Sequence, residues 1–339
     1  MKGMKIKNII LLLSIIFQII ATNIAYTQSC YTMMFYNVEN YFDTFDDKHS
    51  NDNEFLPSSP KKWDDKKFNK KTLNLYKVIA SIDTNPPVII GLAEVENRYV
   101  IEKLFYSTPL QKFPYKIIHN NSPDKRGIDV ALVYRSDIST NIEYEYIRIN
   151  FPAYPRSTTR DILLAKQIIS KDTIFIFVCH FPSRIGGYES EYKRNYTAKI
   201  LASKIDLLLK SNPFTKIIIM GDFNDEPTDK SINEILKANC SKNIHSQLLI
   251  NTMCLKNHKT GTIKYKGDWY IFDQIIISYN LFKKGLNNKK FFETSIYNPD
   301  FLITIDSKYG GVKPYSTYSD KKYQGGYSDH LPVVIKFCD

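Results

Sequence analysis

Short runs of β-branched and aromatic residues recur along the chain, and each run is about as long as a strand. Gly, Pro, Asn or Asp residues bound the runs, which is typical of strands that end in turns. The runs are Thr32–Tyr36, Val88–Leu92, Val130–Tyr134, Leu163–Ile169, Ile174–Cys179, Ile217–Met220, Tyr270–Ser278 and Pro332–Phe337. The pattern therefore predicts strands over most of the chain.

A second pattern, with apolar residues at steps of three and four, predicts a few helices. It occurs in residues 68–82 and in the lysine-studded residues 196–208, and a third helix is expected near residues 231–236. Strands outnumber helices, and the sequence has neither a strict strand–helix alternation nor a glycine-rich phosphate loop. These features favour an α/β fold in which sheets pack on each other with helices outside.

The length of 339 residues and the apolar content of 43% permit a sizeable core. No Pro/Ser-rich linker or internal repeat divides the chain, so one large domain over residues 29–339 is the simpler interpretation. Residues 309–327 are rich in Gly, Tyr, Ser and Lys with weak periodicity, which predicts a long loop. Long ordered loops often carry function.

The first residues have the pattern of a secretory signal peptide. Three lysines precede an almost unbroken apolar run over residues 9–20, and small or polar residues follow up to residue 29. The run is shorter than the ~20 residues of a comfortable membrane span, although a retained N-terminal anchor is the alternative. We therefore expect residues 1–28 to be removed, a secreted or periplasmic protein, and no stable membrane span in the mature chain. A lipid anchor on Cys30 is less favoured, because Thr27-Gln28-Ser29 matches a lipoprotein cleavage box poorly.

The formal net charge is +11, and removal of the three N-terminal lysines leaves +8. A basic protein suits a polyanionic partner such as nucleic acid or an acidic membrane surface. A lysine-rich surface that arises for compositional reasons is the alternative, and net charge says little about chemistry. We expect a monomer.

Polar residues gather where several of the predicted strands end. Asn37 and Glu39 close the first strand, and because residues two apart in an extended chain share a face, both could serve one site. Glu94 follows the second apolar run, where a carboxylate suits a hard cation such as Mg²⁺. The alternative is that all three belong to ordinary turns or solvated strand ends.

Two further strands end in groups that could act on a phosphoester. His180 could donate to a phosphate oxygen or act as an acid, and the cationic Arg184 follows it in a glycine-containing turn, although a single histidine is more often structural. The strongest local signal is Asp222 and Asn224, which come after a very apolar strand and Gly221. The carboxylate could deprotonate a water molecule, and the amide could hold that water or a phosphate oxygen. An Asp/Asn-rich turn is the alternative.

A carboxylate and a histidine near the C-terminus complement each other. Asp273 lies within an apolar strand, where an unpaired charge is expensive, so it needs a partner. His330 can be that partner, because a carboxylate fixes the tautomer of an imidazole and raises its basicity. We therefore expect His330 to act as a general base with Asp273 orienting it, and Asp329 to bind a metal.

The order of these motifs resembles the endonuclease/exonuclease/phosphatase superfamily, which has the deoxyribonuclease I-like fold. The resemblance covers about residues 31–338, and it is specific because six short motifs occur in the right order, each at a strand end. The motifs are Asn37-Val-Glu-Asn40, Gly91-Leu-Ala-Glu94, Val178-Cys-His180, Gly221-Asp-Phe-Asn224, Phe272-Asp273 and Ser328-Asp-His330.

The resemblance implies a four-layered α/β sandwich, with two packed central mixed β-sheets flanked by helices and a Mg²⁺ or Mn²⁺ site at one edge. It implies that Glu94 is the main metal ligand, with Asn37, Glu39 and Asp329 nearby. The implied catalytic residues are His180, Asp222, Asn224, Asp273 and His330. Arg160, in a segment that resembles the start of a central family strand, is a phosphate-contact candidate, as are Arg126 and Arg184. Asp129 is a candidate support for His180.

The resemblance implies hydrolysis of phosphoester bonds by metal-activated water, with a cation, an activated water and a group that eases the leaving oxygen. Asp222 and His330 both qualify as the base, and His330 is favoured slightly. A nuclease or phosphodiesterase agrees with the basic charge and with the tyrosines of residues 309–327, which could stack on bases. The alternatives are an enzyme for lipid head groups or other small phosphoesters, and a catalytically silent binding module, which the complete residue set disfavours.

The five cysteines form neither a CxxC pair nor a zinc-binding spacing. Cys179 lies within an apolar strand, which predicts a buried free thiol. If Asn37 and His330 meet at one sheet edge, the first and last strands run antiparallel, and their far ends bring Cys30 and Cys338 together. We therefore expect a disulfide or a near contact there, which would exclude lipidation of Cys30.

Overall fold

The computed structural model describes residues 30–169, 171–238, 240, 248–254, 260–319 and 321–339. The signal peptide expected at residues 1–28 lies outside the described residues. No helix within the described ranges combines the length and the apolar character that a membrane crossing requires.

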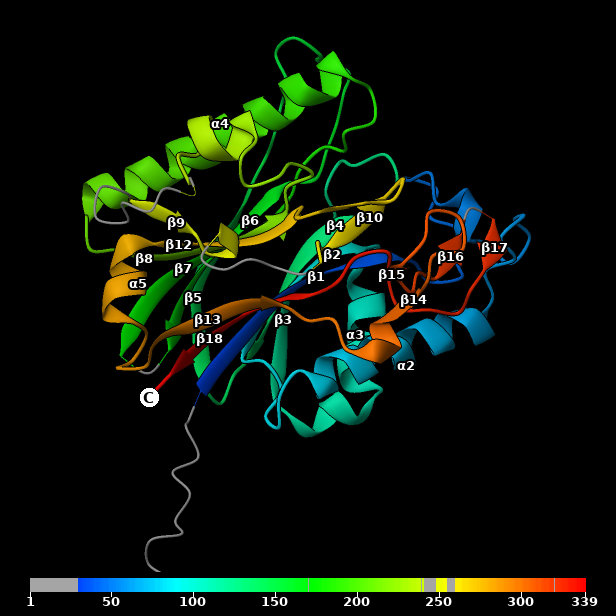
Figure 1. Ribbon diagram of the computed structural model, residues 1–339, viewed down its shortest axis with the longest axis horizontal. Coiled ribbons are helices and arrows are strands. Elements are labelled where there is room, and N and C mark those ends of the chain that lie inside the picture. Colours follow the sequence, from blue (N-terminus) through cyan, green and yellow to red (C-terminus); the bar gives the residue numbers. More distant parts are fainter. Residues whose placement is uncertain (1–29, 170, 239, 241–247, 255–259, 320) are drawn as a thin grey trace, which may run out of the picture.

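Two six-stranded mixed sheets form the centre of the molecule (Figure 1). The first has the order β13-β18-β1-β2-β4-β3, with β1 (Cys30–Tyr41), β2 (Ile89–Val95), β3 (Tyr115–His119), β4 (Asp129–Arg135), β13 (Lys290–Ile296) and β18 (Val333–Cys338). The second has the order β5-β6-β7-β8-β12-β9, with β5 (Ser139–Ile147), β6 (Ile162–Ile169), β7 (Asp172–His180), β8 (Lys216–Asp222), β9 (Leu249–Asn251) and β12 (Asp273–Ser278).

Helices cover the outer faces of both sheets (Figure 1). The α-helices are α2 (Asp65–Ser81), α3 (Arg98–Tyr106), α4 (Tyr188–Ser211) and α5 (Tyr279–Lys284). Short 3₁₀ helices occur at Asn53–Phe55, Pro109–Lys112, Thr252–Cys254 and Asp300–Leu302, and a π-helical turn occurs at Ser231–Ile235. The helices expected over residues 68–82 and 196–208 are thus present as α2 and α4. Asp64 caps α2 by accepting a hydrogen bond from Lys67 N, which satisfies one of the unpaired donors at the helix start.

The core lies between the two sheets and on the outer face of each sheet, where helices cover it. Between the sheets, Met33 and Ile89 of the first sheet pack in one cluster with Ile218 and Ile275 of the second. On the outer face of the second sheet, residues of α4 such as Leu201 pack in another cluster. The predicted four-layered sandwich of two packed mixed sheets with flanking helices is confirmed.

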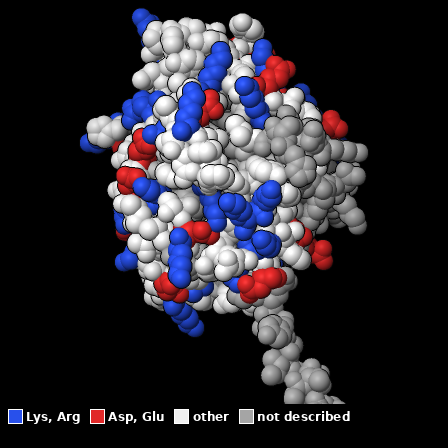
Figure 2. All heavy atoms as spheres, turned by 90° about the vertical axis from the view of Figure 1, so that its left-hand side faces the viewer, with Lys and Arg blue, Asp and Glu red and all other residues white. Residues whose placement is uncertain are grey.

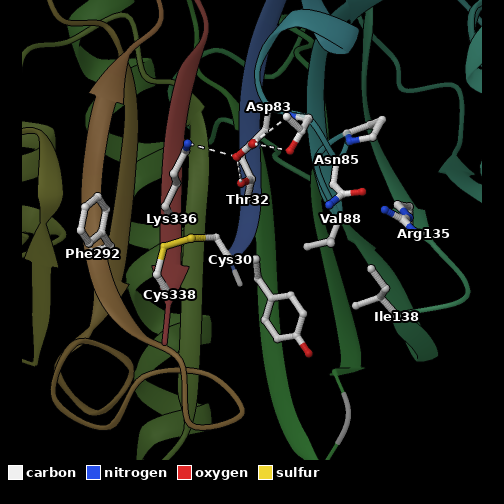
Figure 3. A pocket seen from close by; sticks show the side chains of 13 residues that line it. Cys30, Thr32, Asp83, Asn85, Val88, Arg135, Ile138, Phe292, Lys336 and Cys338 are labelled. Atoms are coloured by element: carbon white, nitrogen blue, oxygen red, sulfur yellow. Dashed lines mark hydrogen bonds and ion pairs between the residues drawn. A yellow bond between two sulfur atoms is a disulfide. The ribbon is translucent and has the colours of Figure 1, made fainter. Parts of the chain in front are cut away.

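Strand β1, the first strand described, lies beside β18, the last one. It pairs antiparallel with β18, and in this register Cys30 lies opposite Cys338. The two cysteines form a disulfide, as predicted (Figure 3). A cavity of about 650 Å³ lies beside this disulfide, and the charges of Lys336 and Asp83 in its wall pair with each other at 3.1 Å. Cys179 is a buried free thiol, as expected, and Cys240 pairs with Cys254.

The sequence pattern did not predict several strands, including short ones within a segment that was expected to be a loop. Strands β3, β5, β9 and β13 were not predicted, and β5 in particular is an edge strand whose outward side chains are polar or exposed, so its pattern carries little apolar signal. Residues 309–327, predicted as a loop, contain β15 (Val312–Pro314), β16 (Tyr318–Ser319) and β17 (Lys322–Tyr323). β15 pairs with β14 (Ile303–Ile305), β16 pairs with β17, and β10 (Ile263–Tyr265) pairs with β11 (Asp268–Tyr270).

Candidate active site

The ends of four central strands meet at one edge of the sandwich. β1 and β2 run parallel in one sheet, and β7 and β8 run parallel in the other. Contacts between the sheets bring Asn37 to Asp222 at 3.0 Å and Glu94 to His180 at 3.9 Å, so these four residues lie on the same side. His180 is directly opposite Asp222 in the register. We call this side, defined by those four residues, the catalytic edge. The Cys30–Cys338 disulfide lies at the opposite end of β1.

The backbone is irregular where the candidate residues occur. The register shifts between Asn37 and Tyr41 in β1 and again beside Glu94 in β2. Glu39, Glu94 and Asn224 have positive φ angles of 53°, 62° and 49°. Such angles are uncommon for residues other than glycine and tend to occur at functional sites. β1 is therefore bulged here, so the extended-strand spacing that was expected to place Asn37 and Glu39 on one face does not apply to this segment.

Asp273 and His330 form a buried pair, in agreement with the sequence interpretation. Asp273 Oδ2 lies 2.7 Å from His330 Nδ1, and Asp273 is fully buried. Burial alone would lower the pKa of His330, but the Asp273 and Asp222 carboxylates raise it well above its ordinary value. The imidazole therefore favours its charged form, with Nε2 3.8 Å from Asp222 Oδ2.

Asp222 is the centre of a hydrogen-bond network. Its Oδ1 accepts from the Asn224 backbone N–H at 2.9 Å, and its Oδ2 accepts from the Asn37 amide at 3.0 Å. Burial and the charge of Asp273 raise the pKa of Asp222 to about 6, although His330 opposes that rise. Gly221 permits this close approach of strands, since a Cβ there would lie 2.5 Å from the Cys179 carbonyl oxygen.

His180 is a neutral donor or acceptor at the same place. Burial lowers the pKa of His180 well below its ordinary value, and the positive charges of Arg160 and Arg126 act in the same direction. Its Nε2 lies 3.6 Å from Asp222 Oδ2 and 3.9 Å from Glu94 Oε1. A neutral imidazole in this position can donate a hydrogen bond to a phosphate oxygen without adding a positive charge to the site.

Glu94 and Asp329 offer oxygen atoms suited to a divalent cation. Glu94 Oε2 accepts from Asn40 N at 2.9 Å, whereas its Oε1 has no hydrogen-bond donor among the described residues. Partial desolvation and the negative charges of Glu39 and Glu94 raise the pKa of Asp329 to about 7. Carboxylates that repel each other in this way fit a site for a hard cation.

A second set of groups is close enough to share an ion. Asp222, Asp273 and His330 each provide an atom within 4.8 Å of the others. However, Asp273 and His330 are already bonded to each other at 2.7 Å. Glu94, in contrast, keeps one oxygen, Oε1, without a hydrogen-bond donor among the described residues.

The three candidate arginines differ in how far they are engaged. Arg126 is half-exposed, and its guanidinium lies 3.9 Å from Glu94 Oε1. Arg160 is buried, where it donates to Asp124 Oδ2 at 2.9 Å and to the Phe181 carbonyl at 2.7 Å. Arg184 donates to the Asn224 carbonyl at 2.8 Å and lies 4.7 Å from the centre of the Phe272 ring. Arg126 therefore has the greatest freedom to meet a substrate.

Two candidate residues have other partners than expected. Asp129 does not support His180: its Oδ2 lies 3.3 Å from His119 Nε2, and its Oδ1 accepts from Ser122 N at 2.8 Å. The sequence could not fix this register, because it did not reveal β3, which ends at His119. Glu39, expected beside the metal, accepts from the backbone N–H groups of residues 317 and 318.

Lys71 is a charged residue of this region that the sequence interpretation missed. It is buried in α2, three residues after Phe68 and four before Leu75, which are both buried. That spacing places it on the apolar face of the helix. The signal was therefore present in the helical pattern, where a lysine interrupts the buried face.

The model of the Endonuclease/Exonuclease/phosphatase family matches residues 32–338, nearly the whole described chain. The chain belongs to this family. Membership makes the protein a phosphoester hydrolase and confirms the resemblance inferred from the six motifs. A search of curated proteins found no match.

Solved structures of the endonuclease/exonuclease/phosphatase type share the fold. An endonuclease/exonuclease/phosphatase family protein from Bacteroides thetaiotaomicron has a TM-score of 0.58 and 14% identity, covering 92% of this chain and 98% of that one. TDP2 from D. rerio, complexed with single-strand DNA product, has a TM-score of 0.57 and 14% identity, covering 91% and 99%. A mannosyl-6-phosphatase from B. thetaiotaomicron has a TM-score of 0.56 and 14% identity, covering 90% and 98%.

Proposed function

We propose that this protein is a secreted, divalent-metal-dependent phosphodiesterase that cleaves nucleic acid with an activated water molecule. The observation that carries the proposal is the Asp273–His330 pair, which directs His330 Nε2 toward Asp222 at the catalytic edge. His180 Nε2 lies 3.6 Å from the same Asp222 oxygen and 3.9 Å from Glu94 Oε1. Acidic, basic and neutral hydrogen-bonding groups thus converge on one small region.

In this proposal, Asp222 accepts the proton of the attacking water. Its carboxylate is held by Asn37 and by the backbone of Asn224, so its free lone pairs have a fixed direction. The sequence favoured His330 as the base, but carboxylates raise the pKa of His330 well above its ordinary value, so it is mostly protonated at neutral pH. His330 then serves as a charged donor to a phosphate oxygen, as a preorganised group that meets developing negative charge.

The remaining groups hold the phosphate. The neutral His180 contacts one non-bridging oxygen, and the half-exposed Arg126 contacts another or the adjacent phosphate of a strand. Glu94, with Asp329 and Asn37 nearby, would hold the metal. Bound there, Mg²⁺ or Mn²⁺ would supply positive charge to the phosphate oxygens and lower the pKa of a coordinated water.

Nucleic acid is the proposed substrate because the protein is basic, with 46 Lys and Arg against 35 Asp and Glu. On the face shown in Figure 2, Lys and Arg are scattered among acidic and uncharged residues, so that face forms no continuous basic stripe. Elsewhere on the surface, Lys61 Nζ lies 5.4 Å from the centre of the Tyr318 ring, and Lys67 Nζ lies 5.1 Å from the centre of the Tyr323 ring. Aromatic and cationic side chains together are typical of single-strand binding. Secretion rests on the N-terminal pattern and agrees with the two disulfides.

The test is a substrate panel with purified protein, Mg²⁺ or Mn²⁺, and EDTA controls. The panel contains DNA, RNA, bis-p-nitrophenyl phosphate, sphingomyelin and inositol phosphates. We expect EDTA-sensitive cleavage of nucleic acid and of the diester, and its loss in His330→Ala with the fold retained. Activity confined to lipids or small phosphomonoesters would overturn the nucleic-acid assignment, and full activity of His330→Ala would overturn the mechanism.

A further inference from the structure

A buried ammonium group that the proposed reaction does not use lies beside the catalytic edge. Lys71 of α2 is 1% exposed, and its Nζ donates to Thr317 Oγ1 at 2.5 Å and to the Tyr327 carbonyl at 2.6 Å. Glu39 Oε2 lies 3.8 Å away. Burial of a charge is unfavourable unless hydrogen bonds and an opposite charge compensate for it. The three partners lie outside α2, so Lys71 connects this helix to β1 and to residues 317 and 327.

Lys71 contacts the residues on both sides of the β16–β17 hairpin, Thr317 before it and Tyr327 after it. Within residues 317–319 and 321–327, β16 and β17 pair with each other as a hairpin. Glu39 holds the outgoing end, because its Oε2 accepts from Thr317 N at 2.6 Å and its Oε1 from Tyr318 N at 3.2 Å. Asn74, one turn further along α2, holds the returning end by donating to the carbonyls of Gly325 and Gly326 at 3.0 and 2.6 Å.

The returning end leads directly into the catalytic segment. Tyr327 is followed by Ser328, whose hydroxyl donates to the Asn37 carbonyl at 2.7 Å and accepts from His330 N at 3.0 Å. Asp329 lies between Ser328 and His330. The hold that Lys71 exerts on Tyr327 is therefore two residues from Asp329 and three from His330.

We propose that Lys71 is a positioning residue that fixes the hairpin 317–327 on the catalytic edge, and that Glu39 anchors this hairpin instead of binding the metal. Both oxygens of Glu39 accept backbone N–H groups, and Glu39 faces an ammonium group. Glu94 differs, because its Oε1 has no hydrogen-bond donor among the described residues. We call the contacts of Lys71 and Glu39 with residues 317 and 327 the latch. The role of the hairpin in orienting Asp329 and His330 rests on the proposed function, whereas the latch itself does not.

The test of the latch compares Lys71→Met with Lys70→Met, a control on the exposed face of the same helix. Loss of a hydrogen bond from a charged donor is expected to raise amide hydrogen exchange at Thr317 and Tyr318 at least about 10-fold in Lys71→Met, with exchange in the central strands unchanged. Trypsin should cut faster after the exposed Lys322. Lys70→Met should match the wild type in both measurements. Unchanged exchange in the hairpin of folded Lys71→Met would overturn the proposal.

Thr317→Val serves if Lys71→Met does not fold, because it removes only a hydroxyl acceptor and keeps the volume. We expect about 3-fold faster exchange at Tyr318 in this variant, and no change would count against the latch. The positioning role predicts that kcat falls about 10-fold or more in Lys71→Met while KM changes little. An unchanged kcat would refute that role. If the wild type cleaved no phosphoester, the exchange data would still decide the latch, so the two failures are distinguishable.

The role of Glu39 is tested by calorimetric titration of Mn²⁺ into Glu39→Gln and Glu94→Gln. We expect the Mn²⁺ dissociation constant of Glu39→Gln to stay within about 3-fold of the wild type, and that of Glu94→Gln to rise by about 10- to 100-fold. Hairpin exchange should rise in Glu39→Gln and stay unchanged in Glu94→Gln. Equal weakening of Mn²⁺ binding in both variants would show that Glu39 is a ligand and would overturn its assignment as an anchor.

Discussion

The substitution Asp273→Asn replaces a buried carboxylate by an amide of nearly the same size. Asp273 is fully buried, and its Oδ2 lies 2.7 Å from His330 Nδ1. Its backbone pairs with Asp222 in the β12–β8 ladder, so the position of the residue is set by the sheet and survives the change. What is lost is the negative charge behind the imidazole.

The magnitude follows from the geometry. A buried hydrogen bond to a charged group contributes about 1.5–3 kcal/mol. At about 1.4 kcal/mol for each factor of ten in rate, we expect kcat to fall about 10- to 150-fold if this bond holds His330 in the transition state. The pKa of His330 should also fall, since Asp273 is the first of the carboxylates that raise it. Asp273 Oδ1 has no hydrogen-bond partner in the described structure, so an amide N–H₂ there would be unsatisfied and should destabilise the fold by about 1–3 kcal/mol.

The assay is the steady-state hydrolysis of bis-p-nitrophenyl phosphate with Mg²⁺, accompanied by thermal unfolding to verify the fold. The matching variant is His330→Gln, alone and combined with Asp273→Asn. If Asp273 acts through His330, its substitution should change kcat less than about 3-fold once His330 is absent. A kcat of Asp273→Asn within 3-fold of the wild type, or a full effect without His330, would refute the reasoning.

Three further predictions concern the rate, the fold and the disulfide. Activity should fall as the pH drops through about 6, because Asp222 with its raised pKa becomes protonated and loses its function as a base; a pH–rate profile flat down to pH 4 would contradict this. Arg160→Met should destabilise the protein by about 1.5–3 kcal/mol, since the buried Asp124 carboxylate loses its charged donor at 2.9 Å and keeps only the Arg126 N–H and, at 3.8 Å, the Arg126 guanidinium; guanidinium unfolding measures this, and an unchanged free energy of unfolding would show that the Arg160–Asp124 pair does not stabilise the fold. Loss of the Cys30–Cys338 disulfide, whose partners are 308 residues apart, should cost about 5 kcal/mol on the chain-entropy scale and leave kcat unchanged, because the bond lies at the far end of β1; a stability unaffected by reductant, or a large loss of kcat, would contradict this.

The sequence predicted the parts of the site that depend on strand ends. An apolar run must be buried, so the first polar residue after it marks the edge of a sheet, and this rule located Glu94, His180 and Asp222. The pairing of Cys30 with Cys338 followed from the same rule, because it needed only the direction of two strands.

The rest depended on local backbone geometry and on partners distant in sequence. Nothing in the strand pattern indicates that Glu39 and Glu94 adopt positive φ, which turns their side chains in directions an extended strand does not allow. Glu39 therefore meets residues 317 and 318, nearly 280 positions away. Asp129 was assigned to the wrong histidine because the five-residue strand that ends at His119 was not recognised in the sequence.

The position of β1 between β18 and β2 has a consequence for the synthesis of the chain. β18 is the last strand of its sheet in chain order, so β1 keeps an open edge until β18 has been made. A nascent or truncated chain would expose that edge as a template for pairing with other chains. A stop codon shortly before β18 would also separate β13 from the rest of its sheet. A truncation that removes β18 should therefore yield an aggregating product.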